Sequence, residues 1–398
     1  MTKKPKVVVM GLGYIGLPTA ALIASKGISV TGVDVHQNVI DTINRGEIHI
    51  VEPDLDGLVH HVVKEGYLKA SKQPVRADVY LIAVPTPFKD EHVPDLSYVE
   101  AAVTKLLPTL APNALVIVES TSPVGTTQKV YDIIVSARPE LKGKIHTAYC
   151  PERVLPGNII YELEHNDRAI GGLDYTSTKK AVAFYQHFVK GDLHETNART
   201  AEMCKLVENS SRDVQIAFAN ELSMICDRAE IDVWELIALA NRHPRVNILQ
   251  PGTGVGGHCI AVDPWFIVSE FPEESKIIRS ARTINNYKTL WVIEKIINET
   301  LRYSQEYGEE PIVACMGLAF KPNIDDLRES PALTVADALR DKGISTLRVE
   351  PNLKQEDLTP YQEAVDKANI IVYLVAHKDF YSIRTDKQVL DFCGISKN

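Results

Sequence analysis

A glycine-rich turn near the start of the chain limits the possible folds more than any other feature. The pattern G-x-G-x-x-G at Gly11–Gly16 follows a short apolar run, Lys6–Met10, and leads into a segment of helical character. Glycines at this spacing allow a tight turn and let the backbone approach a pyrophosphate at the N-terminus of the next helix. A second apolar run, Ser29–Val33, ends at Asp34, whose carboxylate would accept hydrogen bonds from ribose hydroxyls and repel a 2′-phosphate. We therefore expect a dinucleotide-binding α/β domain that takes NAD; the alternative is a glycine turn in an unrelated α/β protein.

Length, charge and cysteine content exclude several classes of protein. A chain of 398 residues is long enough for two or three domains. Its formal net charge of -9 argues against a broad surface for nucleic acid or for anionic membranes. The six cysteines form neither a C-x-x-C pair nor a zinc-ligand spacing, which predicts free thiols, a reducing compartment and no metal site. No apolar stretch approaches the ~20 residues that span a bilayer, so we expect a cytoplasmic protein.

Alternating strand-like and helix-like segments define the expected first domain, residues 1–196. Short apolar runs recur at Val79–Val84, Leu115–Val118 and Thr147–Cys150, and helical stretches such as Tyr98–Leu107 separate them. This alternation predicts a parallel sheet that helices cover on both faces.

The rest of the chain divides into a helical part and a second α/β part. Thr200–Ala229 has no glycine or proline and carries apolar residues at helical spacing, which predicts one long helix in a central domain, residues 197–302. The polar stretch Tyr303–Glu310 is predicted to be a linker. After it, runs such as Ile312–Met316 restore the strand–helix alternation and predict a Rossmann-like third domain, residues 303–398.

Polar residues follow three of the predicted strands in the first domain. Thr86 and Thr121 lie in proline-containing segments after two of them, and Glu152 and Arg153 follow a third. Ligands of such folds bind at the carboxyl ends of parallel strands, so these side chains are candidates to face cofactor or substrate. Ordinary turn residues and an exposed ion pair are the alternatives.

Three polar residues, Lys205, Asn209 and Arg212, stand at helical spacing within the long predicted helix. Positions i, i+4 and i+7 share one helix face. Because the helix is otherwise apolar, part of this face can be buried, and a desolvated lysine has a lowered pKa suited to proton transfer near neutral pH. Asn209 could hold a water or a developing oxyanion. A solvated charged stripe is the alternative.

A thiol, Cys259, ends the glycine-rich loop Gly252–Gly257, with Asp263 four residues further on. A cysteine is by default a buried, inert residue, but the glycine-rich, arginine-flanked context favours a reactive thiol. Together with a nicotinamide cofactor, a nucleophilic cysteine suggests an oxidation that passes through a covalent acyl-enzyme. We assign a structural role to His258, because sequence neighbours in an extended loop point apart.

A last pair of basic residues, Lys321 and Arg328, follows the first predicted strand of the third domain. Both are candidate anion ligands, and a capped helix start is the alternative.

Taken in order, these motifs resemble those of the UDP-glucose/GDP-mannose dehydrogenase family along the whole chain. They are the N-terminal glycine pattern, V-P-T-P at 84–87, E-S-T at 119–121, C-P-E-R at 150–153, K-x-x-x-N at 205–209, G-G-x-C at 256–259, and G-L-A-F-K at 317–321 with D-x-R-x-S-P at 326–331. Three further segments are most similar to a bacterial branch of the family that acts on UDP-N-acetyl-D-mannosamine: Asn44–His49, Asn241–Val246 and Cys259–Phe266.

The resemblance implies a four-electron oxidation of a sugar C6 hydroxyl to a carboxylate, with NAD used twice. Lys205 would exchange the proton of the alcohol, and Cys259 would form a thiohemiacetal and then a thioester. A water positioned by residues such as Thr121, Asn209 and Asp263 would hydrolyse the thioester, and Glu152 is a further catalytic candidate.

The resemblance also implies two sets of ligand contacts and a homodimer that pairs through the central helix, with no nucleic acid or membrane as partner. The NAD contacts would be Gly11, Gly13, Tyr14, Ile15, Gly16, Asp34, Thr86, Thr121 and Arg328. The UDP-sugar contacts would be Arg153, Val154, Lys205, Asn209, Arg212, His243, Arg245, Gly256, Lys321 and Pro322.

One position departs from the family pattern, because Cys393 stands where a basic residue near the UDP is usual. Two other functions stay open. A single-step β-hydroxyacid dehydrogenase would need neither the nucleophilic cysteine nor the third domain, and a non-catalytic nucleotide sensor would have no use for Lys205 and Cys259 together. UDP-N-acetylmannosamine, UDP-N-acetylglucosamine and UDP-glucose differ by one acetamido group or one stereocentre, so the sequence leaves the preferred sugar open.

Overall fold

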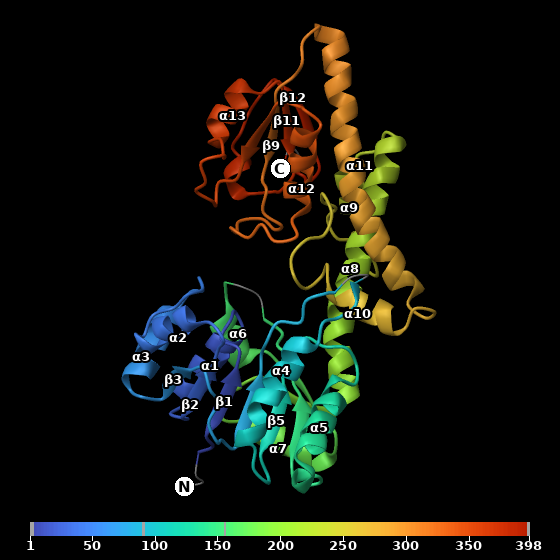
Figure 1. The fold of residues 1–398 in the computed structure, drawn as a ribbon. Helices are drawn as coiled ribbons and strands as arrows, with labels where there is room; N and C mark the ends of the chain where they lie inside the picture. The colour runs from blue at the N-terminus through green and yellow to red at the C-terminus, as the bar shows by residue number, and fades with distance from the viewer. Residues whose placement is uncertain (1–3, 90–91, 155–156, 396–398) are drawn as a thin grey trace. The chain divides into compact units, whose positions relative to one another are not determined.

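The chain forms two compact units, residues 1–207 and residues 208–398. The computed structural model describes residues 4–89, 92–154 and 157–395 (Figure 1). Within these ranges no helix is long and apolar enough to cross a membrane.

The N-terminal unit is built on one eight-stranded sheet in the order β3-β2-β1-β4-β5-β6-β7-β8. Its strands are β1 (Val7–Met10), β2 (Val30–Val33), β3 (Leu68–Ser71), β4 (Val79–Ile82), β5 (Leu115–Val118), β6 (His146–Tyr149), β7 (Arg168–Gly172) and β8 (Leu193–Asn197). The predicted parallel sheet is confirmed for β1 to β6. The prediction is wrong for the last two strands, because β7 pairs antiparallel with β6 and β8 pairs parallel with β7. β7 starts at the edge where β6 ends, so the chain turns back there instead of crossing over the sheet.

Helices cover both faces of this sheet, as predicted (Figure 1). Successive strand residues point to opposite faces. Val7 and Val9 therefore join the core that α1, α3, α6 and α7 form, whereas Val8 and Met10 join the core under α4 and α5. The helices are α1 (Gly16–Ser25), α2 (Gln37–Asn44), α3 (Leu55–Lys64), α4 (Ser97–Leu106), α5 (Thr126–Ala137), α6 (Ile159–His165) and α7 (Tyr175–Tyr185).

Long helices follow the first sheet. The predicted long helix is α8 (Ala198–Arg228), which starts in the N-terminal unit; α9 (Val233–Ala240), α10 (Asp263–Glu270) and α11 (Lys276–Tyr307) follow it. The linker predicted at Tyr303–Glu310 is wrong in its first part, because α11 continues to Tyr307. Nothing before Gly308 breaks the helix, and Gly308 ends it with a left-handed φ of 73°.

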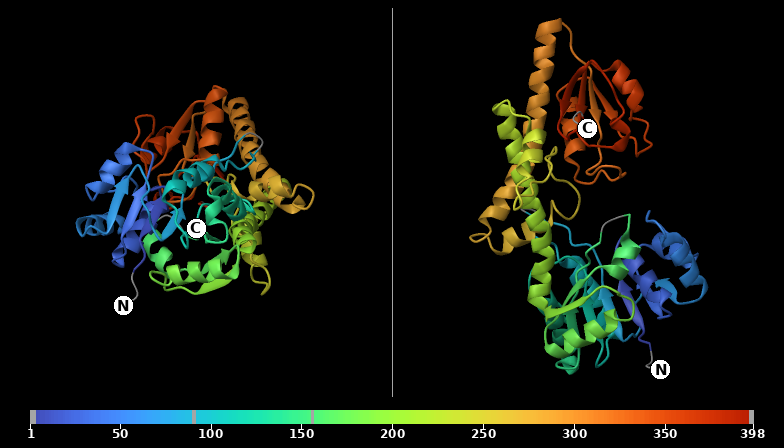
Figure 2. Two further views of the ribbon diagram at one scale, coloured as in Figure 1. Left: turned by 60° about the horizontal axis from the view of Figure 1, so that its bottom comes forward. Right: turned by 180° about the vertical axis from the view of Figure 1, so that it is seen from behind.

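The C-terminal sheet of the second unit is parallel throughout, in the order β10-β9-β11-β12. Its strands are β9 (Val313–Met316), β10 (Thr346–Val349), β11 (Ile370–Tyr373) and β12 (Gln388–Asp391). One face packs on α11 and α12 (Pro331–Asp341), and the other on α13 (Tyr361–Lys367) and the short η4 (Lys378–Phe380), as Figure 2 shows from a second side. This arrangement confirms the predicted Rossmann-like fold of the C-terminal part.

Candidate active site

The glycine turn after β1 has the geometry that the sequence predicts. Gly11 adopts a left-handed φ of 91°, and a Cβ at Gly16 would collide with the carbonyl of Gly11, so neither position tolerates a side chain. A Cβ at Gly13 would meet no atom within 4 Å. The middle glycine therefore faces open space in front of α1, whose first residues have no side-chain cap. Space and uncapped N–H groups suit the pyrophosphate of a dinucleotide.

Asp34 at the end of β2 belongs to the same turn. Its carboxylate accepts hydrogen bonds from the N–H groups of Leu12 at 3.1 Å and His36 at 2.9 Å. Although partial burial opposes ionisation, these N–H groups hold the pKa of Asp34 below its ordinary value. The side chain therefore stays a carboxylate, the form that accepts hydrogen bonds from a ribose. Tyr14 is exposed and Ile15 half-buried beside it.

The strand ends of the first sheet carry the next candidates, as the sequence predicts. Thr86 follows β4, Thr121 follows β5, and the hydroxyl of Thr86 donates to the carbonyl of Thr121 at 2.7 Å. The two loops therefore meet at the carboxyl edge of the sheet, where α/β folds bind ligands.

A buried ion pair joins the end of β6 to α8. The Nζ of Lys205 lies 2.9 Å from both the carboxylate Oε1 and the backbone carbonyl of Glu152. Lys205 is only 6% exposed and Glu152 9%. Burial disfavours the ammonium, and the carboxylate compensates for this penalty. The predicted burial of Lys205 is confirmed, but its pairing with Glu152 was not foreseen.

Two neighbours of Glu152 are held less tightly. The N–H of Val154 donates to the Glu152 carboxylate at 3.1 Å, whereas the guanidinium of Arg153 donates to the carbonyl of Asp167 at 3.2 Å. Both residues are half-buried.

Cys259 lies exposed at the turn before α10. Its carbonyl accepts hydrogen bonds from the N–H groups of Val262 at 3.0 Å and Asp263 at 2.8 Å, which close the turn. The side chain of the neighbouring His258 is also exposed to solvent. Desolvation and the nearby Arg328 charge lower the pKa of His258. An exposed thiol is available to react, in contrast to the fully buried Cys150 and Cys315.

The glycines before Cys259 allow a close approach between two loops. A Cβ at Gly256 would collide with the carbonyl of Glu329, and one at Gly257 would lie 2.9 Å from the ring of Phe320. The N–H of Gly257 donates to the carbonyl of Arg328 at 3.2 Å. The cysteine loop is therefore fixed against the loop between β9 and α12, which carries Lys321 and Arg328.

Asn209 and Asp263 form a second polar pair, within the C-terminal unit. The side-chain amide of Asn209 donates to the Oδ2 of Asp263 at 2.5 Å, and Asp263 is 2% exposed. Asp263 also begins α10, where a carboxylate is favourable to the helix dipole.

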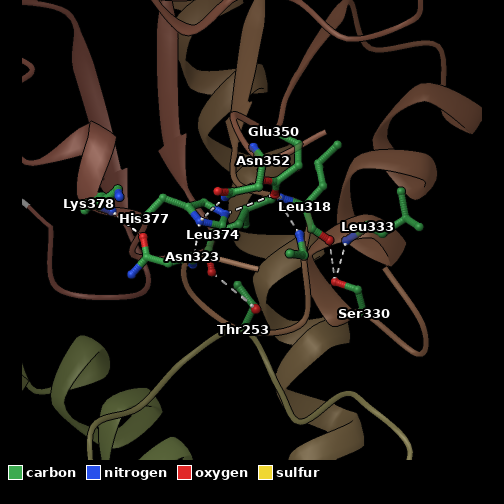
Figure 3. Close-up of polar contacts among 11 residues, drawn as sticks. Thr253, Leu318, Asn323, Ser330, Leu333, Glu350, Asn352, Leu374, His377 and Lys378 are labelled. Atoms are coloured by element: carbon green, nitrogen blue, oxygen red, sulfur yellow. Dashed lines mark hydrogen bonds and ion pairs between the residues drawn. The ribbon is translucent and has the colours of Figure 1, made fainter. Parts of the chain in front are cut away.

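A cavity of about 820 Å³ opens beside these loops in the C-terminal unit. Gln250–Gly254, Phe320 and Pro322 line one part of it, and the hydroxyl of Thr253 reaches the carbonyl of Leu374 at its border (Figure 3). Lys321 is exposed between two lining residues. A cavity of this size can take a nucleotide. Three lining residues that sequence reasoning missed are Trp234, Tyr381 and Phe320, of which only Phe320 stood in a recognised motif.

The structure describes all ten predicted substrate residues, and only Pro322 among them lines this cavity; Arg212, His243 and Arg245 are three that do not. All three are exposed. His243 and Arg245 lie on a loop that the Asn241 side chain closes through hydrogen bonds to the N–H and carbonyl of Ile248. The guanidinium of Arg328, predicted to contact NAD, is paired with Asp326 at 2.6 Å.

Comparison with known proteins agrees with this geometry. The sequence matches the NAD binding domain of the UDP-glucose/GDP-mannose dehydrogenase family over residues 5–189, the central domain over residues 199–287 and the UDP binding domain over residues 314–395. The chain belongs to the UDP-glucose/GDP-mannose dehydrogenase family. The proposed resemblance is thus confirmed, and NAD is the cofactor.

Relatives and solved structures cover nearly the whole chain. It is 52% identical to the UDP-N-acetyl-D-mannosamine dehydrogenase of Escherichia coli (strain K12), over 97% of this chain and 98% of that protein. It is 51% identical to the NDP-N-acetyl-D-galactosaminuronic acid dehydrogenase of Ralstonia nicotianae, over 95% of this chain and 92% of that protein. The structure of UDP-D-ManNAc dehydrogenase from Pyrococcus horikoshii has a TM-score of 0.90 and 38% identity, and the match covers 98% of this chain and 96% of that chain.

These findings establish an NAD-dependent oxidoreductase of the nucleotide-sugar dehydrogenase type. They decide against the β-hydroxyacid dehydrogenase and the non-catalytic sensor. The division into three domains and the roles of the individual site residues stay predictions.

Proposed function

We propose that the protein oxidises the C6 hydroxyl of UDP-N-acetyl-D-mannosamine to the carboxylate in two NAD-dependent steps. The observation that carries the two-step reaction is the exposed thiol of Cys259, held at a tight turn directly before the Asp263–Asn209 pair. The choice of sugar rests on the named relatives.

NAD is proposed to bind the glycine turn and Asp34, and when bound it accepts a hydride in each oxidation. Gly13, Tyr14, Ile15 and the loops of Thr86 and Thr121 would surround it, and Arg328 would contribute a positive charge. The fit rests on the open space at Gly13 and on the ionised Asp34.

The uridine diphosphate is proposed to occupy the 820 Å³ cavity, with Lys321 at its rim and Pro322 in its lining. A lysine ammonium suits a diphosphate. Arg153, Val154, Arg212, Gly256, His243 and Arg245 are the other proposed substrate contacts. None of these six described residues lines the cavity, and we assign His243 and Arg245 to the site of a partner subunit.

In the first oxidation, Lys205 as the neutral amine takes the proton of the C6 hydroxyl while the aldehyde forms, and Glu152 stabilises the resulting ammonium. The thiol of Cys259 then adds to the aldehyde carbon; a carbon–sulfur bond forms and the thiol proton passes to the carbonyl oxygen. The second oxidation removes two electrons from this thiohemiacetal and leaves a thioester.

Hydrolysis completes the reaction. A water held by Thr121, Asn209 and Asp263 attacks the thioester carbon, the carbon–sulfur bond breaks, and the sulfur regains a proton. One alcohol, two NAD⁺ and one water thus give one carboxylate, two NADH and three protons.

The test measures NADH and uronic acid for UDP-N-acetylmannosamine, UDP-N-acetylglucosamine, UDP-N-acetylgalactosamine and UDP-glucose. We expect two NADH per sugar consumed and the highest kcat/KM for UDP-N-acetylmannosamine. In Cys259→Ser we expect acid formation to be lost, and in the control Cys226→Ala, a buried thiol of α8, we expect it to be retained. Unimpaired acid formation in Cys259→Ser would refute the thioester, and a preference for another sugar would refute the substrate.

We also propose a homodimer that pairs through α8. Phe218 and Ile225, two turns apart on this helix, are 56% and 57% exposed. Such large apolar side chains on one helix face favour burial against a second copy. Light scattering on Phe218→Glu/Ile225→Glu should give a smaller mass than the unaltered protein; an unchanged mass would contradict this interface.

A further inference from the structure

The C-terminal sheet repeats the path of the N-terminal glycine turn but uses its acidic residue differently. Gly317 after β9 has a φ of 89°, close to the 91° of Gly11 after β1. Glu350 directly follows β10, as Asp34 follows β2. The side chain of Glu350, however, is fully buried, whereas Asp34 is half-buried. The acid in the C-terminal sheet therefore serves the protein itself and not a ribose.

Both carboxylate oxygens of Glu350 are occupied by protein donors (Figure 3). Oε2 accepts from the N–H groups of Leu318 at 2.8 Å and Ala319 at 2.9 Å, and from His377 Nε2 at 3.0 Å. Oε1 accepts from the backbone and side-chain N–H groups of Asn352 at 3.1 and 3.0 Å. Although burial opposes ionisation, the hydrogen bonds from His377 and Leu318 lower the pKa of Glu350 to about 2.

The ionised carboxylate settles the tautomer of His377. A carboxylate only accepts hydrogen bonds, so the proton between the two side chains belongs to His377 Nε2. His377 Nδ1 is then an acceptor, and it receives the backbone N–H of Asn323 at 2.9 Å. The side chain of Asn352 lies 3.0 Å from the same nitrogen. The buried Glu350–His377 pair thus accepts backbone hydrogen bonds at both of its ends, from Leu318 and Ala319 on Glu350 and from Asn323 on His377.

These contacts fix both ends of one short loop, residues 318–323. Glu350 holds its start at Leu318, and His377 holds its end at Asn323, which has a left-handed φ of 61°. The hydroxyl of Ser330 donates to the carbonyl of Leu318 at 2.7 Å and secures the start a second time. Between the two anchors stand the cavity-lining Phe320 and Pro322, with Lys321 between them.

We infer that Glu350 and His377 are positioning residues for nucleotide binding, which hold the loop 318–323 against the cavity without touching the ligand. This inference rests on the proposed function, because it takes the cavity to be the UDP site. The ring of His377 packs close to Gly317, where an added Cβ would lie 3.0 Å from its Cδ2.

Two substitutions of His377 separate its two hydrogen bonds. His377→Asn keeps an acceptor near the place of Nδ1 for the N–H of Asn323 but does not reach Glu350. His377→Gln keeps a donor near the place of Nε2 but has no acceptor for Asn323. Val365→Ala, a buried residue of α13 that packs on this sheet, is the control for a general loss of stability.

The experiment is calorimetric titration of the full-length variants with UDP alone, followed by kinetics with UDP-N-acetylmannosamine. We expect His377→Gln to weaken UDP binding about tenfold, the effect of one lost buried hydrogen bond, and His377→Asn to stay within about threefold. KM should rise in parallel with the loss of UDP affinity. In contrast, kcat should stay within about twofold of the unaltered protein, because the chemistry is untouched. Asn352→Ala, at an exposed position, is the second variant, for which we expect a loss of about threefold.

A result in which His377→Gln binds UDP as well as His377→Asn or Val365→Ala would overturn the inference. If His377→Gln does not fold, unchanged UDP binding in Asn352→Ala has the same consequence. Failure of the unaltered protein to bind UDP would instead refute the proposed function, so the two failures are distinguishable.

Discussion

Replacement of Glu202 by alanine should destabilise the N-terminal unit more strongly than its place on a helix suggests. Glu202 on α8 is fully buried and accepts three hydrogen bonds from the start of α5. The donors are the N–H of Gly125 at 2.6 Å and the N–H and hydroxyl of Thr127, both at 2.7 Å. No side chain at Gly125 caps α5, so Glu202 acts as its cap from 75 residues away.

The expected magnitude follows from these contacts. Glu202→Ala leaves one buried and one part-buried backbone N–H group without this acceptor, and each costs about 1–3 kcal/mol, so we expect a loss of about 4 kcal/mol. Glu202→Gln keeps one acceptor oxygen but loses the negative charge at the helix N-terminus, which predicts a loss of about 2 kcal/mol.

Urea unfolding followed by far-UV circular dichroism measures the effect. Tryptophan fluorescence is the internal reference, because all three tryptophans lie in the C-terminal unit: Trp234, Trp265 and Trp291. The matched control is Asp132→Ala, an exposed carboxylate on α5 in the same unit, with an expected change below about 0.5 kcal/mol. A loss below about 1 kcal/mol in Glu202→Ala, or equal losses in Glu202→Ala and Asp132→Ala, would refute the assignment of Glu202 as a cap.

Three further outcomes follow from the structure. Gly16→Ala should weaken NAD binding at least tenfold by calorimetry, because its Cβ would collide with the Gly11 carbonyl; unchanged affinity would contradict the glycine-turn geometry. Glu350 has a pKa lowered from 4.5 to about 2, so its stabilisation is complete above pH 4.5 and is lost as the pH falls towards 2; it amounts to about 3 kcal/mol. In Glu350→Gln the free energy of unfolding should no longer fall with pH between 4.5 and 2. The same fall in the variant and in the unaltered protein would count against the lowered pKa of Glu350. Burial lowers the pKa of Lys288 from 10.5 to about 7, which makes the folded state less stable as the pH falls from 10.5 to 7. Lys288→Met should therefore raise the free energy of unfolding at pH 7 by about 2 kcal/mol and flatten its rise towards pH 10. A lower free energy of unfolding at pH 7 in this variant would contradict the prediction.

The glycine turn and most strand and helix positions could be predicted from sequence because their causes are local. Gly11 needs its left-handed φ for the turn, and a Cβ at Gly16 would collide with the carbonyl of Gly11 five residues earlier. The apolar runs of β1 and β5 reflect burial on both faces. Helix boundaries were less predictable, since the polar end of α11 continues until Gly308 offers a left-handed residue.

The partners of the catalytic candidates could not be predicted in the same way. Lys205 and Asn209 were singled out by helical spacing, but Glu152 lies 53 residues from Lys205, and Asp263 lies 54 residues from Asn209. Neither pairing is visible in a local pattern, because each depends on which strand end or loop the folded chain brings to the helix.

The sequence by itself determined the type of fold, the NAD-binding turn and the candidate for a reactive thiol. Gly11–Gly16, Asp34 and Cys259 carry that information in short-range chemistry. Only the tertiary structure decided that β7 and β8 reverse direction, that Glu202 caps α5, and that Glu350 faces His377 instead of solvent. A buried polar group is stable only where its hydrogen-bond partners are, and those partners come from distant segments that meet when the chain has folded.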